Sequence, residues 1–165
     1  MDIIKTSTDW ARAELFSAKI IWLFSVILIL CAIAFSYWGK TITAKAFFIP
    51  LIVAGILLIG IGVGLYWANK PRIKQFEKEF SMNPREFVRK EIERTAKSQR
   101  ELALVFKILP AIIIVAALVI VFFPAPYCRT IGITVILTAA FLMAVDSNTD
   151  ARNSAYHLQL LNTKL

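Results

Sequence analysis

The sequence predicts an all-α polytopic membrane protein with four transmembrane helices, forming two membrane hairpins joined by a cytoplasmic amphipathic helical hairpin. Of its 165 residues, 58% are hydrophobic and only 18% are charged, and the mean hydropathy is +0.68. Water-soluble domains of this length usually carry fewer apolar and more charged residues. The apolar excess is concentrated in four long runs. We therefore interpret residues 1–165 as a single membrane domain.

The apolar runs predict four spans, at about residues 20–38, 46–67, 102–123 and 130–146. A helix rises about 1.5 Å per residue and the hydrocarbon core is about 30 Å thick, so roughly 20 apolar residues cross it. The fourth run is shorter, but Tyr127, Thr130 and Ser147 flank it at headgroup level. The alternative for this run is a re-entrant or interfacial segment. We favour a span because its only polar residues, Thr134 and Thr138, can bond back to the preceding helical turn.

The orientation follows from the distribution of lysine and arginine, because positively charged flanks are retained in the cytoplasm. With the N-terminus inside, Lys40, Lys45 and Arg129 lie outside and Lys107 lies within the third span. All the others among the 19 basic residues then lie inside. We expect both termini in the cytoplasm and anionic lipid at the basic inner face. The compact loops favour a bacterial inner (plasma) membrane.

Residues 70–101 form the only sizeable polar segment, and their pattern predicts the cytoplasmic helical hairpin. In its first helix Ile73, Phe76 and Phe80 recur at helical spacing. Asn83 followed by Pro84 is a strong signal for the start of a second helix, because asparagine caps and proline suits the first turn.

The second helix of this hairpin should continue into the third span. It has a narrow apolar stripe beside Phe87, made of Val88, Ile92 and Ala96. Glutamate precedes lysine by four residues in two pairs, Glu86 with Lys90 and Glu93 with Lys97, which favours an exposed helix. We expect the two helices to pair through four residues: Phe76, Phe80, Phe87 and Ile92.

Amphipathic helices are also predicted at both ends of the chain. Trp10, Ala13 and Phe16 can lie on one face ahead of the first span, with tryptophan at the membrane interface. Ser147 and Asp150 have the spacing of a capping box, which predicts a separate C-terminal helix at residues 147–163. Its apolar stripe consists of Ala151, Ala155, Leu158 and Leu161.

Glycine is concentrated in the second span, where Gly60 and Gly64 form a GxxxG pair and Gly55 precedes them. Glycines of this kind let two helices approach closely. We predict a helix-packing or oligomer interface here. Packing against small residues of the first or fourth span is favoured over self-association.

Ionisable residues near the middle of a membrane usually mark an ion or proton path, and these spans have none there. Lys107 lies near the inner end of the third span, one turn before Pro110, which is expected to kink the helix. Asp146 lies at the inner end of the fourth span, so we predict an inner-edge ion pair between Lys107 and Asp146.

Several classes of chemistry lack the residues they need. Cys31 lies deep in the first predicted span and Cys128 at the outer edge of the fourth, and the chain has one histidine, so we expect no disulfide, metal or cofactor. The net charge of +8 follows the inner loops and is interleaved with glutamates, so we expect no nucleic-acid partner. We find no nucleophile with a base, no phosphate loop and no paired carboxylates, and expect no enzyme.

One short motif is typical of an enzyme. Arg152 and His157 have the Arg-x4-His spacing, with asparagine after the arginine, that resembles the motif of HEPN ribonucleases. The match covers six residues, and two residues five apart lie about 140° round an ideal helix. We interpret the pair as a surface arginine and an interfacial histidine.

The leading function hypothesis is a small integral membrane scaffold or accessory subunit that presents basic cytoplasmic helices to a protein partner. The predicted partner surface consists of Arg85, Arg89, Arg94 and Lys97. The alternative is a homo-oligomeric channel or pore, with the glycine-rich second spans packed together. Its lumen would be lined by Ser25, Ser36, Thr134 and Thr138.

Overall fold

A computed structural model describes residues 3–163, and within this range the chain is helical, with no strand. Residues 1–2 and 164–165 of the predicted domain lie outside the described residues. The helices are α1 (Ile3–Trp38), α2 (Ile42–Ala46), α3 (Phe48–Asn69), α4 (Arg72–Met82), α5 (Pro84–Phe122) and α6 (Pro126–Leu161).

The predicted all-helical class with four potential spans is confirmed, because four helical segments are long and apolar enough to cross a membrane. α1 and α6 each have 36 residues and α5 has 39. At about 1.5 Å per residue, 36 residues extend about 54 Å, well beyond the roughly 30 Å of a hydrocarbon core. Each long helix therefore has a substantial part that a bilayer would leave uncovered.

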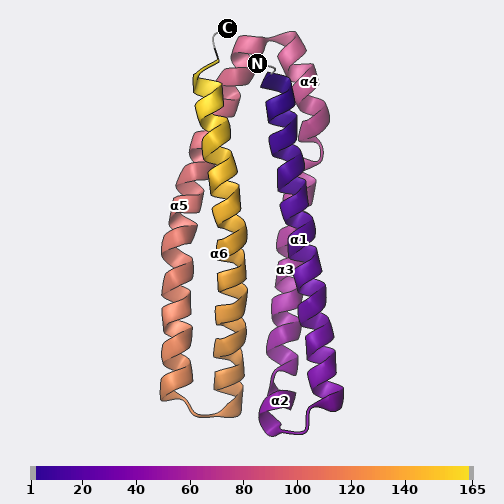
Figure 1. Ribbon diagram of the computed structural model, residues 1–165, viewed down its shortest axis with the longest axis vertical. Helices are drawn as coiled ribbons and strands as arrows, with labels where there is room; N and C mark the ends of the chain where they lie inside the picture. Colours follow the sequence, from indigo (N-terminus) through magenta and orange to yellow (C-terminus); the bar gives the residue numbers. More distant parts are fainter. Residues whose placement is uncertain (1–2, 164–165) are drawn as a thin grey trace.

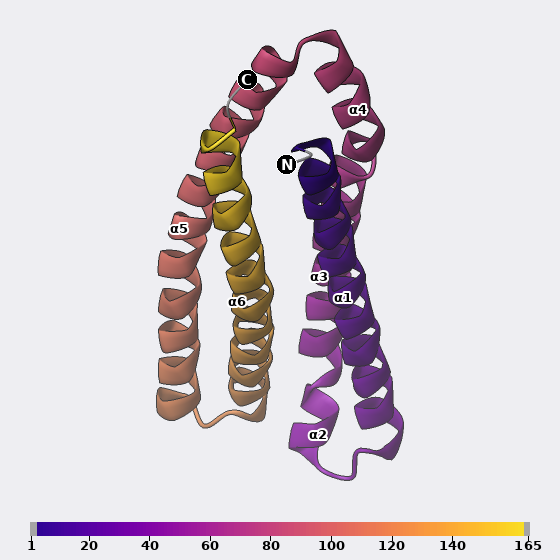
Figure 2. The same ribbon diagram turned by 45° about the horizontal axis from the view of Figure 1, so that its top comes forward.

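The long helices are arranged as two pairs (Figure 1). α1 lies beside α3, and α5 lies beside α6, whereas α4 and the first turns of α5 connect one pair to the other (Figure 2). Both described chain ends lie at the end of the molecule that carries α4. We call this end the head and define it as residues 3–19, 70–101 and 147–163.

The molecule has two separate hydrophobic cores. The core of the head draws on α1, α4, α5 and α6 and comprises Ile3, Trp10, Ala11, Phe76, Phe87, Val88, Tyr156 and Leu160. The core between the apolar parts of the helices comprises Ile21, Leu28, Ala32, Leu51, Ala54, Leu58 and Val145. The head is therefore a small packed bundle of its own and not a bare stalk.

The signals predicted for the α4–α5 region are present in the structure. The Asn83 side chain accepts a hydrogen bond from the Glu86 backbone N–H at 3.1 Å, and Pro84 occupies the first position of α5. The Phe87 ring makes edge contacts with Phe76 and Phe80, at centroid distances of 5.6 and 5.7 Å. The predicted aromatic contact between the two helices is thus confirmed.

The C-terminal segment differs from the prediction. α6 continues through Ser147 without a break, so this serine caps no helix. The side chains that face the head core are Asn153, Tyr156 and Leu160, whereas the predicted stripe of Ala151, Ala155, Leu158 and Leu161 is exposed. Asn153 and Tyr156 face inward because they form hydrogen bonds with other helices of the head.

The N-terminal segment also differs. α1 begins at Ile3 and runs unbroken to Trp38, and Trp10 is buried in the head core. Phe16, predicted on the same face as Trp10, is 62% exposed. Trp10 therefore packs inside the protein and is not an anchor at the membrane interface.

The glycines of α3 divide into two faces. A Cβ built on Gly55 would lie 2.7 Å from Ile29 Cγ1, and one on Gly62 would lie 2.5 Å from the Trp22 ring, so both glycines are needed for the close approach of α1. Gly60 and Gly64 have no atom within 4 Å of such a Cβ. The GxxxG pair thus faces away from the described chain, and its predicted packing within the bundle is wrong.

Candidate functional site

The interior of the head is polar, and its charges are paired across helices. Glu14 of α1 is only 5% exposed and accepts a hydrogen bond from Arg152 Nη2 of α6 at 2.9 Å. The same nitrogen lies 2.8 Å from Ser17 Oγ. Because a buried carboxylate is costly without a partner, this ion pair ties α1 to α6.

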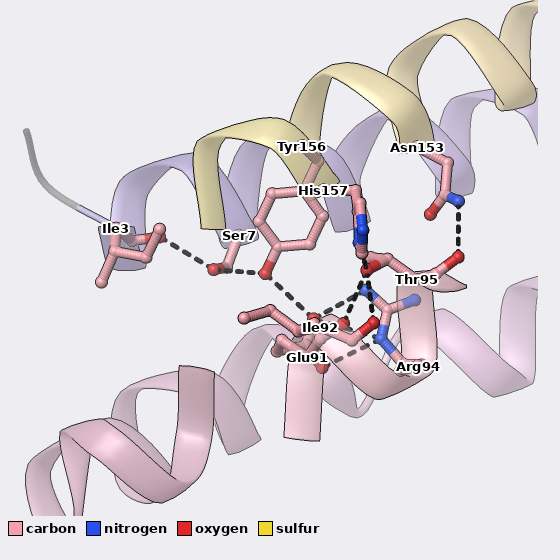
Figure 3. A network of polar contacts seen from close by, with 9 residues as sticks. All are labelled: Ile3, Ser7, Glu91, Ile92, Arg94, Thr95, Asn153, Tyr156 and His157. Carbon is pink, nitrogen blue, oxygen red and sulfur yellow. Dashed lines mark hydrogen bonds and ion pairs between the residues drawn. The ribbon is translucent and has the colours of Figure 1, made fainter. Parts of the chain in front are cut away.

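A second buried pair lies on α5. Arg94 makes a forked contact with Glu91, with nitrogen to oxygen distances of 2.6 to 3.1 Å (Figure 3). Tyr156 Oη of α6 lies 2.9 Å from Glu91 Oε2 and 2.7 Å from Ser7 Oγ of α1. The phenol proton goes to the carboxylate, since a charged acceptor makes the stronger bond. Three helices therefore meet at one phenol.

A third group of contacts links α5 to α6. Thr95 Oγ1 lies 2.6 Å from His157 Nδ1, and the Thr95 carbonyl accepts a hydrogen bond from Asn153 Nδ2 at 3.0 Å (Figure 3). Gln99 Nε2 also donates to Ser154 Oγ at 3.2 Å. Glu91 and Thr95 lie one turn apart, so α5 presents a polar face to α6 in the head.

Trp10 occupies the centre of this arrangement. Its ring stacks on Tyr156 at a centroid distance of 5.7 Å, and the Arg94 guanidinium lies 4.0 Å from the Trp10 ring centroid. A cation over an indole face is electrostatically favourable. The indole Nε1 is buried and has no hydrogen-bond partner in the described chain.

Burial changes the ionisation of two groups in the head. It raises the pKa of the Tyr156 phenol well above its usual range, and the negative charge of Glu91 adds to this shift. Burial also lowers the pKa of Arg72, and the neighbouring Arg94 acts in the same direction. The tyrosine thus stays protonated as a hydrogen-bond donor over the physiological range.

The predicted partner surface is only partly a surface. Arg85, Arg89 and Lys97 are exposed on α5, but Arg94 faces inward onto Glu91 and Trp10. Arg94 therefore does not belong to this surface, because its guanidinium is occupied inside the head. We define the basic patch as Arg85 and Arg89, which lie one turn apart.

Two predicted ion pairs are not formed. Lys107 faces a groove between α5 and α6, whereas Asp146 faces a cavity beneath the head, and no ion pair joins the two residues. Lys97 approaches Glu101 at 3.8 Å in place of Glu93. The predicted pair of Glu86 with Lys90 is present at 3.1 Å.

The Arg-x4-His residues serve different helices. Arg152 points to α1, where it binds Glu14, and His157 points to α5, where it meets Thr95. Arg152 is therefore not the surface residue that we expected. The two side chains do not converge on one point, and among residues 3–163 no group of histidine, cysteine, aspartate or glutamate has a metal-binding arrangement.

A cavity of about 400 Å³ lies beneath the head, between the two helix pairs. Its lining combines apolar residues, among them Leu65 and Leu102, with polar groups, among them Arg72 and Trp10. Asp146 also lines it. Sequence patterns did not reveal this cavity, because its walls come from α1, α3, α4, α5 and α6.

No protein family, curated protein or solved structure matches this chain. The features of the chain that bear on its function are the polar interior of the head, the basic patch and the cavity.

The residues missed by sequence reasoning share a recognisable signal. Glu14 lies among mostly apolar residues just before the first span. Glu91 and Thr95 occupy positions one turn apart on α5, where apolar residues would be expected in a core. Polar residues at core spacing indicate a buried network when a partner helix is available. That partner was not visible locally, because Tyr156 follows Glu91 by 65 residues.

Proposed function

We propose that this protein is a small integral membrane scaffold or accessory subunit whose head presents basic helices to a protein partner. The observation that carries the proposal is the basic patch: Arg85 and Arg89 are exposed, and neither has a carboxylate partner within the described chain. Unpaired guanidinium groups on a helix are suited to an acidic protein face, because complementary charge guides association.

The packing of the head supports this role. The patch lies next to Phe87 and Val88, which belong to the head core, and α5 is held to α6 through Glu91 and Thr95. A surface fixed on a packed bundle loses little conformational freedom when it binds. The patch is therefore preorganised for a partner.

The proposal includes an orientation. The four long helices cross the membrane as two hairpins, and the head with both termini lies in the cytoplasm, because the head collects most of the lysines and arginines. The same charges favour contact with anionic lipid at the inner face of a bacterial inner membrane. Lys40, Lys45 and Arg129 lie at the opposite end of the long helices.

Site-specific crosslinking in native membranes tests the scaffold. A photoreactive residue at Met82, which is 75% exposed and close to the patch, is combined with Arg85→Glu and Arg89→Glu. We expect a discrete protein adduct that disappears with the double charge reversal and persists with Lys40→Glu and Lys45→Glu at the other end. An adduct insensitive to the patch charges would contradict the proposal.

The second candidate is a homo-oligomeric channel, and the outward-facing Gly60 and Gly64 favour self-association. The hydroxyls give it less support. Ser25 and Thr134 are buried, Thr138 bonds to the Thr134 carbonyl, and only Ser36 of the four is exposed. Ion flux from liposomes containing the protein supports the channel, whereas tight liposomes support the scaffold.

A further inference from the structure

The cavity beneath the head has the two-sided lining that an amphipathic ligand needs. Its apolar wall includes Leu65, Leu102 and Val105, which belong to the parts of α3 and α5 nearest the head. Arg72 and Trp10 lie on the head side. A volume of about 400 Å³ falls within the usual range for small-ligand sites.

Most charged groups in the cavity wall already have partners. Glu14 is paired with Arg152, Arg94 with Glu91, and Lys97 with Glu101. Within each pair the two charges balance, so these residues leave little net charge for a ligand.

Two opposite charges in the wall have no partner among residues 3–163. Arg72 is half-buried, and no carboxylate of the described residues pairs with its guanidinium, which makes only a distant contact of 5.9 Å to the Trp10 ring centroid. Asp146 is half-buried, and no cation or hydrogen-bond donor from the same part of the chain contacts it. The two side chains line the same cavity without pairing with each other.

A third unpartnered group lies in the same wall. Trp10 is 92% buried, as its exposed fraction is 8%, and its indole Nε1 has no acceptor among the described residues. Buried indole N–H groups normally have a hydrogen-bond partner. The tryptophan therefore adds an unused donor to the residues that line the cavity.

We propose that this cavity binds the headgroup of a phosphoethanolamine lipid, with the phosphate at Arg72, the ammonium at Asp146 and an acyl chain along the apolar wall. Phosphate oxygens are suited to a guanidinium, and a primary ammonium can donate hydrogen bonds to a carboxylate. The proposal does not depend on the scaffold function, because its residues lie apart from the basic patch.

The lining distinguishes this lipid from others. A phosphatidylglycerol headgroup has no cation for Asp146, and the quaternary ammonium of phosphatidylcholine has no N–H to donate to it. Free phosphoethanolamine also combines a phosphate with a primary ammonium but leaves the apolar wall without a ligand. The apolar wall therefore favours the lipid over the soluble compound.

Native mass spectrometry of the full chain in mild detergent provides the test. The protein is titrated separately with phosphatidylethanolamine, phosphatidylglycerol, phosphatidylcholine and free phosphoethanolamine, and the bound fraction is measured. The variants are Arg72→Gln and Asp146→Asn, with Arg129→Gln as a control that removes an exposed arginine outside the cavity and outside the basic patch. Thermal unfolding by circular dichroism verifies that each variant is folded.

We expect wild-type protein and Arg129→Gln to retain phosphatidylethanolamine in preference to the other three ligands. Losing one charge-assisted contact should weaken this binding about tenfold or more in either cavity variant. Asp146→Asn should leave phosphatidylglycerol binding unchanged, whereas Arg72→Gln should weaken both phospholipids. Equal retention of all lipids, unchanged binding in folded variants, or preferential binding of free phosphoethanolamine would overturn the proposal.

Discussion

At the scale of single residues, Glu14 shows how the head depends on charge pairing. Its carboxylate is nearly inaccessible to solvent, and the cation that pairs with it, Arg152, comes from α6, more than a hundred residues later. Exchanging such a pair for apolar residues can be neutral, but removing one partner leaves a buried charge. Arg152 is therefore the residue to change.

Arg152→Ala should lower the free energy of unfolding by about 3 kcal/mol, because Glu14 then stays buried without its cation. We place the loss at the lower end of the range for broken buried pairs, since Arg152 is 30% exposed. Denaturant unfolding in detergent, monitored by circular dichroism, measures the loss.

Arg12→Ala is the matched control. Arg12 also lies in the head, but its contact with Asp9 is 3.7 Å long and exposed, and exposed pairs contribute about 0 to 1 kcal/mol. If both alanine variants unfold at the same denaturant concentration, the Glu14 pair does not stabilise the head.

Tyr156 makes the stability depend on alkaline pH. Its folded-state pKa is raised, so the native state holds the phenol proton where the unfolded chain, with an ordinary pKa of about 10, has lost it. The stabilising contribution is complete below pH 10 and falls above it, at up to about 1.4 kcal/mol per pH unit. Tyr156→Phe should remove this part of the decline.

The measurement is the melting temperature between pH 8 and 11, compared between wild type and Tyr156→Phe so that other titrating groups cancel. Tyr127→Phe is the control, because Tyr127 is 61% exposed. A decline that is identical in wild type and Tyr156→Phe would show that the phenol does not carry this linkage.

At the scale of helices, the contact between α1 and α3 is set by two glycines. Gly55→Ala and Gly62→Ala place a methyl group within 2.7 Å of Ile29 or Trp22, and such overpacking usually costs about 1 to 3 kcal/mol. Gly60→Ala and Gly64→Ala fill open space on the same helix. We expect lower thermal stability from the first two substitutions and none lost from the second two, measured in detergent.

Failure of this contrast would have a clear meaning. If Gly60→Ala and Gly64→Ala destabilise the protein as much as Gly55→Ala does, the GxxxG face is occupied in solution by another copy. Light scattering of the same samples would then show an oligomer that dissociates in these two variants.

The predictability of the helices has a physical limit. Helix periodicity located α4 and α5, and the aromatic contact of Phe76 and Phe87 followed from it, because those residues are close in sequence. The inward face of α6 did not follow from hydrophobicity. Asn153 and Tyr156 face the core, and the alanine and leucine stripe does not. The reason is that Asn153 and Tyr156 form hydrogen bonds with Thr95 and Glu91 of α5.

The candidate site, like the helices, was only partly predicted from the sequence. Arg85 and Arg89 were found because exposed charge is a local property. The sequence did not predict that Arg94 faces inward, and it did not predict the cavity. Both depend on helices brought together from distant parts of the chain. Local patterns identify surfaces more readily than pairings between distant segments.

At the scale of the whole molecule, the two cores are suited to two different surroundings, lipid and water. Between the apolar parts of the helices the core is made of aliphatic side chains such as Ile21, Leu28 and Leu58, which suits a segment surrounded by lipid. In the head, hydrogen bonds and ion pairs between α1, α5 and α6 hold the two helix pairs together. The cavity lies where these regions meet.

This division requires that the head lie on one side of the membrane, and our proposal assigns it to the cytoplasm on the basis of its excess of positive charge. Single cysteines are introduced as Ser81→Cys in the head and Lys40→Cys between α1 and α2, with Cys31 and Cys128 changed to serine. A membrane-impermeant maleimide added to intact bacterial spheroplasts should label Lys40→Cys at once and Ser81→Cys only after lysis. Both sites belong to exposed residues, so a difference in labelling reports sidedness and not burial. The reverse pattern would place the head outside, and the scaffold proposal would then require an extracytoplasmic partner.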